Sequence, residues 1–103
     1  MKIIKVVTEK IQDEVEDARE YAEMANEYKE SYPELAKVFY TLSTQEMEHM
    51  NMLHKQVTEI IRKYRETNGE PPADMLAVYE YLHGKQIEQA LEVKTLQTMY
   101  KES

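Results

Sequence analysis

The sequence predicts an all-α protein: a long antiparallel helical hairpin followed by a third helix. Only two glycines and three prolines occur in 103 residues, and 17 residues are glutamate, a composition that favours helix over sheet. Apolar residues recur at three- and four-residue spacing along two long segments, which is the period of an amphipathic helix. A short break separates these segments. By its length the chain is one domain, which we assign to residues 1–103.

The first helix is expected over residues 3–30. A serine and a proline then interrupt the pattern: Ser31 followed by Glu34 matches a capping box, and Pro33 suits a first helical turn. One face of this helix is apolar or aromatic except at Glu14. That face consists of Ile4, Val7, Ile11, Ala18, Tyr21, Ala25 and Tyr28.

The second helix is expected over residues 33–68, and Asn68-Gly69 followed by two prolines should end it. Its apolar face is interrupted at Glu46 and His49. Because the break after the first helix is short, the two helices should form an antiparallel hairpin. The apolar positions of the second helix are Leu35, Phe39, Leu42, Leu53, Val57, Ile60 and Tyr64.

The third helix is expected over residues 74–100, with Asp74 as its N-cap. Glu80 and His83 form a second Glu-x-x-His pair, but they lie about one residue around from the apolar face. We therefore expect them on a solvated flank, and we expect His54 to be a surface or interface histidine. The apolar face of this helix consists of Met75, Tyr79, Leu82, Ala90, Val93 and Tyr100.

The charge and the absence of cysteine exclude several function classes. A formal net charge of −7 disfavours binding to nucleic acid or to an anionic membrane surface. No apolar run approaches the roughly 20 residues that span a bilayer. Without cysteine there is no disulfide, no thiolate metal site and no cysteine nucleophile. We expect a cytoplasmic protein without nucleic-acid or membrane partners.

Glu14, Glu46 and His49 are the candidate functional residues, because each interrupts an apolar face. An unpaired buried carboxylate costs several kcal/mol, so something must compensate its charge. In a hairpin folded about residues 31–32, facing residues have numbers that sum to about 63, as Glu14 and His49 do. The three side chains should therefore share one level, with Asp17 as an acidic neighbour. Carboxylates with imidazole suit iron, manganese or zinc.

Another interpretation of the same residues is a buried polar layer that sets the helix register and is closed by water or a cation. Lys94 on the third helix is the obvious cationic partner for such a layer. Glu16 and Asp17 also compete with Glu14 for the position on the first helix, although the apolar face favours Glu14.

A helix with Glu14, followed in a hairpin by Glu46-Met47-Glu48-His49, resembles the ferritin-like superfamily. The Glu46–His49 string is similar to the second helix of rubrerythrins. The short chain resembles the encapsulated ferritins, which build a di-iron site across a dimer interface. The resemblance implies dimerisation into a ferritin-like four-helix bundle with Glu14, Glu46 and His49 of each chain as metal ligands. It also implies two iron ions per dimer and ferroxidase-like oxidation of ferrous iron by dioxygen or peroxide.

Two departures from these families bear on function. The sequence contains no rubredoxin-like cysteine pairs, and we expect no targeting extension after Tyr100. Two alternatives therefore stay open beside a di-iron homodimer or higher homo-oligomer. One is a non-redox bundle that binds manganese or zinc, and the other is a non-enzymatic helical assembly module.

Overall fold

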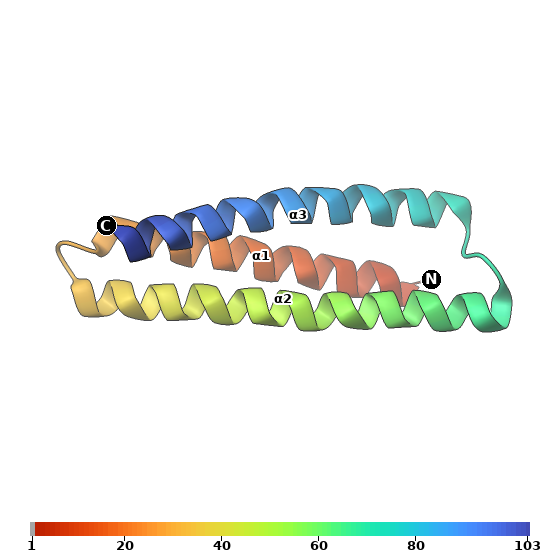
Figure 1. Cartoon of the computed structure of the whole chain (residues 1–103). Coiled ribbons are helices and arrows are strands. Elements are labelled where there is room, and N and C mark those ends of the chain that lie inside the picture. The colour runs from red at the N-terminus through yellow and green to blue at the C-terminus, as the bar shows by residue number, and fades with distance from the viewer. Residues whose placement is uncertain (1) are drawn as a thin grey trace.

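The computed structural model describes residues 2–103, which form three helices. These are α1 (Lys2–Tyr28), α2 (Pro33–Asn68) and α3 (Ala73–Glu102). They lie side by side in an elongated bundle with extents of 55 × 19 × 18 Å (Figure 1). The described residues contain no strand, so the all-α prediction is confirmed, and the helix ends differ from the predicted ends by at most two residues. None of these helices is long and apolar enough to cross a membrane.

The central helix of the bundle is α1. It packs along both α2 and α3, whereas α2 and α3 contact each other much less. In Figure 1, α1 runs behind the other two helices and between them. On the face where α2 and α3 lie apart, side chains of both helices and Ile11 of α1 line a groove of about 400 Å³.

The helix ends are set partly by backbone geometry. Gly69 has φ of 77°, a left-handed conformation that favours glycine, and its N–H donates to the Arg65 carbonyl at 3.2 Å. The helix stop predicted at Asn68-Gly69 is confirmed, but the predicted N-caps of α2 and α3 are wrong. The N-cap of α2 is Tyr32, without a side-chain cap bond, and the N-cap of α3 is Pro72. Asp74 lies inside the first turn of α3, where its negative charge suits the helix dipole.

A cluster of buried apolar residues lies between the first half of α1 and the second half of α2. It consists of Ile4, Ile11, Val57 and Ile61. Towards the α1–α2 turn, fully buried Ala18, Ala22, Ala25 and Ala36 let the helices approach closely. The buried side chains therefore become smaller towards the turn, where the two helices lie closer together, so the space between them stays filled.

In the first half of α2 the buried face is rotated by about one residue from the predicted face, whereas Val57 in the second half is buried as predicted. Leu35 was expected in the core but is 45% exposed, whereas its neighbour Ala36 is buried. Ser43 is likewise buried in place of Leu42, which is only half-buried. The reason is that α1 has two partners, so α2 turns its buried face towards the seam with α1 and α3. The predicted face of α2 therefore lies at the edge of the hairpin.

Hydrogen bonds of polar side chains fix the axial position of α3 along the hairpin. The buried Gln86 amide donates to the Thr8 carbonyl at 3.2 Å. Gln97 donates to the Ser43 hydroxyl at 2.9 Å, and that hydroxyl donates to the Ala18 carbonyl at 2.6 Å. Because a buried polar group without a partner is costly, sliding α3 along the hairpin would break these bonds at a penalty.

Truncating Ile11 tests the core. Ile11 is 2% exposed, and Ile11→Ala is expected to lower the free energy of unfolding by about 2–4 kcal/mol through lost burial and the cavity it leaves. Urea unfolding followed by circular dichroism measures the change. Ile3→Ala is the matched control, because Ile3 is 49% exposed and its truncation should cost well under 1 kcal/mol. Equal losses for the two variants would contradict this account of the core.

Candidate metal centre

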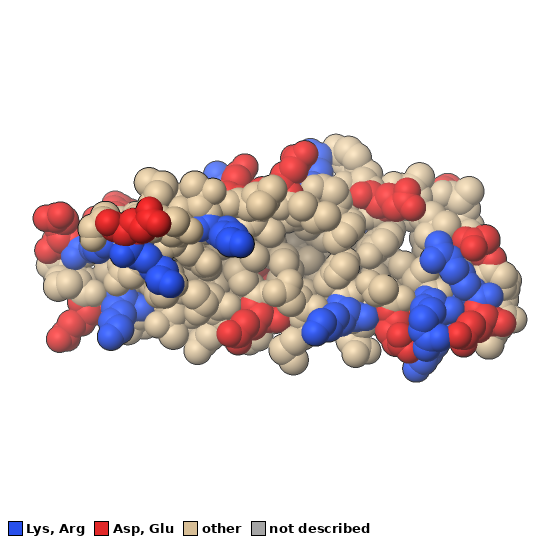
Figure 2. Space-filling view, viewed as in Figure 1, with Lys and Arg blue, Asp and Glu red and all other residues tan. Residues whose placement is uncertain are grey.

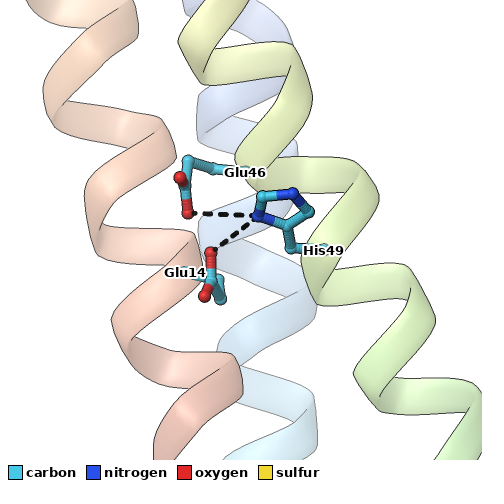
Figure 3. A group of neighbouring side chains, drawn as sticks. All are labelled: Glu14, Glu46 and His49. Carbon is cyan, nitrogen blue, oxygen red and sulfur yellow. Dashed lines mark ion pairs between the residues drawn. The ribbon is translucent and has the colours of Figure 1, made fainter.

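Three side chains from two helices converge at the middle of the hairpin. Glu14 comes from α1, and Glu46 and His49 come from α2, where a spacing of three residues places both on one helix face. Figure 3 shows the three groups pointing towards one another between α1 and α2, with α3 behind them. The register derived from the turn therefore brings these residues to one level, as predicted.

The spacing of the donor atoms suits a single ion. His49 Nδ1 lies 3.4 Å from Glu14 Oε2 and 3.8 Å from Glu46 Oε2. One donor atom from each residue lies within 4.8 Å of the other two. Nitrogen and oxygen ligands bind such metals at about 2.0–2.2 Å, so two ligands of one ion are separated by up to about 4.4 Å. Both measured separations fall within that limit.

The charge of the two carboxylates is poorly compensated within the chain. The Glu14 and Glu46 side chains are 24% and 19% exposed, whereas His49 is 53% exposed. Glu14 Oε2 is buried and accepts no hydrogen bond in the described part of the chain. A buried oxygen without a donor is the kind of atom that a metal ion would satisfy.

The lysine considered for a buried polar layer is not at this site. Lys94 is exposed and lines the groove between α2 and α3. Among residues 2–103, the ion pairs of Glu14 and Glu46 involve only His49. The expectation that Lys94 compensates these carboxylates is therefore wrong, because α3 passes behind the site.

The crowding of the carboxylates changes their protonation. A hydrogen bond with the Glu14 carboxyl, then burial, then the negative charge of Glu14 raise the pKa of Glu46 to about 7. The charge of Asp17 adds to this rise, and His49 opposes it. The two carboxyl groups therefore hold a proton near neutral pH, which a bound cation would displace.

The other acidic and imidazole candidates lie outside this group. Glu16 and Asp17 are exposed, and the structure places neither among the converging donor atoms. Glu80 is also exposed, but its partner His83 is half-buried and packs on His54. The expectation of a solvated flank therefore fails for His83. Apolar periodicity alone could not detect this contact, because apolar and polar residues are spread around all sides of α3.

Comparison with known proteins agrees with this geometry. The model of the Rubrerythrin family matches residues 5–102, nearly the whole described chain. The chain belongs to the Rubrerythrin family. That family is a ferritin-like di-iron family, so the resemblance drawn from Glu14 and the Glu46–His49 string is confirmed. No curated protein and no solved structure matches the chain.

Membership makes the chain a rubrerythrin-family di-iron carboxylate protein. Within it, Glu14, Glu46 and His49 form the candidate metal site, with two carboxylates and one imidazole. This donor set suits iron, manganese or zinc. Three ligands are fewer than a pair of metal ions requires, and the site lies on the side of the hairpin away from α3 (Figure 3).

The shared proton predicts how the metal-free protein responds to pH. The pKa of Glu46 is about 7 in the fold against an ordinary value of 4.5, so folding favours the protonated form. The contribution of protonated Glu46 to the free energy of unfolding is fully present below about pH 4.5 and is lost as pH rises through about 7. We expect a loss of about 1 kcal/mol after solvent screening, or about 4–8 °C in Tm. Glu46→Gln cannot ionise, so Tm profiles that run parallel for the two proteins between pH 4.5 and 8 would refute this.

Proposed function

We propose that two copies of the chain pair through the α1–α2 face and bind two iron ions between them. Glu14, Glu46 and His49 of each copy are the ligands. Ferritin-like sites use one Glu from each of two helices and a Glu-x-x-His pair from each of two others. One hairpin supplies half of that set, and a twofold pair of hairpins supplies all of it. A single protein surface that contacts its own copy is the commonest form of dimer.

The observation that carries this proposal is the convergence of the three donor atoms within 4.8 Å in a rubrerythrin-family chain. The α3 helix lies on the other side of the hairpin and contributes no donor to this group. The missing ligands must therefore come from another molecule, and a second copy supplies the matching half.

The surface around the site also favours a second copy. Leu35, Leu42 and Leu53 lie on the same face of α2 as Glu46 and His49, and Leu35 is 45% exposed. Val38, one turn further along this edge, is 52% exposed. Covering these side chains would remove apolar surface from water, which drives most protein association.

The proposed reaction is ferroxidase-like: ferrous iron is the substrate, and dioxygen or peroxide is the oxidant. Two ferrous ions supply two electrons, enough to reduce dioxygen to peroxide with uptake of two protons. We assign Glu46 as the ligand that both ions would share, because its carboxyl group lies beside both Glu14 and His49. Glu14 and His49 of each copy would complete the ligand set. The proton shared by the two carboxyl groups leaves when iron binds, so iron affinity falls as the medium becomes acidic.

Two rival functions predict different results from one experiment. A site that holds manganese or zinc without redox chemistry binds iron but consumes no oxygen when air is admitted. A helical assembly module binds no iron at this site at all. Oxygen consumption on adding ferrous iron, measured with an oxygen electrode, distinguishes ferroxidase chemistry from both. The control is Glu46→Gln, which keeps the shape of the side chain but removes its charge.

A further inference from the structure

The other two histidines of the chain meet on the opposite side of the bundle. His54 of α2 and His83 of α3 stack with ring centroids 4.3 Å apart and an angle of 11° between their planes. This contact joins the two helices that otherwise touch least. Both residues are half-buried. Tyr79 packs beside His83 at 5.8 Å, so the pair has an aromatic wall on one side.

The two imidazoles have few polar partners. Among the described residues, the only hydrogen-bond contact of either ring joins His54 Nε2 and the Tyr79 hydroxyl at 3.5 Å, a distance too long for a strong bond. His83 has no hydrogen bond in that part of the chain. Burial, and then the neighbouring His83, lower the pKa of His54, so its ring is neutral near pH 7. Neutral imidazole nitrogens are the form that binds metals.

The surroundings of the pair are accessible yet sheltered. His54 and His83 line a groove of about 400 Å³ between α2 and α3. Figure 2 shows this face of the molecule, with few charged side chains near its centre and more towards its ends. The groove walls near the pair include Met50, Asn51 and Ile87. An ion in the groove would therefore reach the imidazoles from solvent, and the one lysine that lines the groove, Lys94, is eleven positions beyond His83 on α3.

We propose that His54 and His83 form a second metal site, in which the two imidazoles bind one divalent ion of the zinc and copper class. A zinc ion with Zn–N distances of about 2.0–2.1 Å holds two imidazole nitrogens about 3.3 Å apart. The stacked rings lie within reach of one ion, and binding would turn both side chains out of the stack so that one nitrogen of each ring points at the ion. Water completes the coordination shell. This site is independent of the carboxylate site and of the proposed ferroxidase function.

The bound ion would link α2 to α3. The helices are 29 positions apart at these histidines and contact each other little, so the link restrains the loosest interface of the bundle. A ligand that binds the folded but not the unfolded chain stabilises the fold in proportion to the logarithm of its concentration over Kd. Zinc is therefore expected to raise Tm by several degrees at saturation.

The test uses a chain in which these are the only histidines. The sequence has three, so Glu46→Ala combined with His49→Ala disables the carboxylate site and leaves His54 and His83. Zinc titrated into this variant by calorimetry is expected to bind at one ion per chain with micromolar Kd and to raise Tm. Adding His83→Phe keeps an aromatic ring in the stack but removes the nitrogens, and it should weaken zinc binding at least tenfold.

A second measurement needs no substitution. Zinc added to the unmodified protein should shift the imidazole proton resonances of His54 and His83 in NMR spectra. Absence of zinc binding in the double variant, or binding that His83→Phe leaves unchanged, would overturn the proposal and leave the pair as packing. Neither result tests the proposed iron site, because the double variant lacks Glu46 and His49. Conversely, failure of the protein to bind iron at Glu46 would not contradict the proposed site at His54 and His83.

Discussion

Replacing Glu46 by alanine is expected to abolish iron binding, with at least a hundredfold loss of affinity, and to leave the helical content unchanged. Glu46 supplies one of three donor groups in each copy and is the proposed bridge, so its loss affects both ions. The side chain is not part of the buried apolar cluster of Ile4, Ile11, Val57 and Ile61, so its removal should leave the helices packed. Anaerobic ferrous-iron titration measures the affinity, and circular dichroism measures the helicity.

The matched control for this prediction is Glu48→Ala. Glu48 lies on the same helix two residues away, is exposed, and is absent from the group of converging donor atoms. Its loss removes the same charge from the chain and should leave iron affinity within about twofold. If both variants lost iron equally, general electrostatic attraction by the acidic surface would explain binding better than ligation.

Introducing a charge at Leu35 is expected to break the proposed dimer and to remove iron binding with it. Burying a leucine contributes about 1.5–3 kcal/mol, and a twofold interface loses this twice, so Leu35→Asp should weaken dimerisation at least a hundredfold. Leu35 is 45% exposed in the single chain and lies in the first turn of α2. An acidic residue there suits the helix dipole, so the isolated chain should stay folded.

Val78→Asp controls for the effect of a new charge on an exposed apolar position. Val78 is 59% exposed and belongs to α3, away from the hairpin face that carries the carboxylates. Sedimentation velocity with and without ferrous iron measures assembly for both variants. A monomeric Leu35→Asp protein that still bound iron with unchanged affinity would show that one chain completes the site alone.

The hairpin and the level of its polar residues could be predicted from sequence because both follow from short-range geometry. The break at Ser31–Pro33 fixes the turn, and a short turn fixes which residues face each other. Glu14 and His49 therefore meet regardless of how the rest of the chain packs. The spacing of Glu46 and His49 is likewise local, since three residues on a helix share a face.

The arrangement of α3 could not be predicted, because it depends on how α2 and α3 both pack against α1. Because α1 packs against both helices, the first half of α2 is rotated from its predicted orientation, so that Leu35 is exposed and Ser43 is buried. The same packing also places His83 against His54 and leaves Lys94 on the far side of the hairpin from the carboxylates. Apolar periodicity gives little information on α3, since apolar and polar residues are spread around all its sides. Its position is set partly by polar bonds such as that from Gln86 to the Thr8 carbonyl.

The most direct test of the proposed site is a ferrous-iron titration of the metal-free protein under anaerobic conditions, followed by admission of air. We expect two irons per dimer, then a rise in ferric absorbance that Glu46→Ala lacks. Binding without that rise would contradict ferroxidase chemistry but keep a metal site. Absence of binding would contradict the site itself, and Glu14, Glu46 and His49 would then be a polar layer of the hairpin.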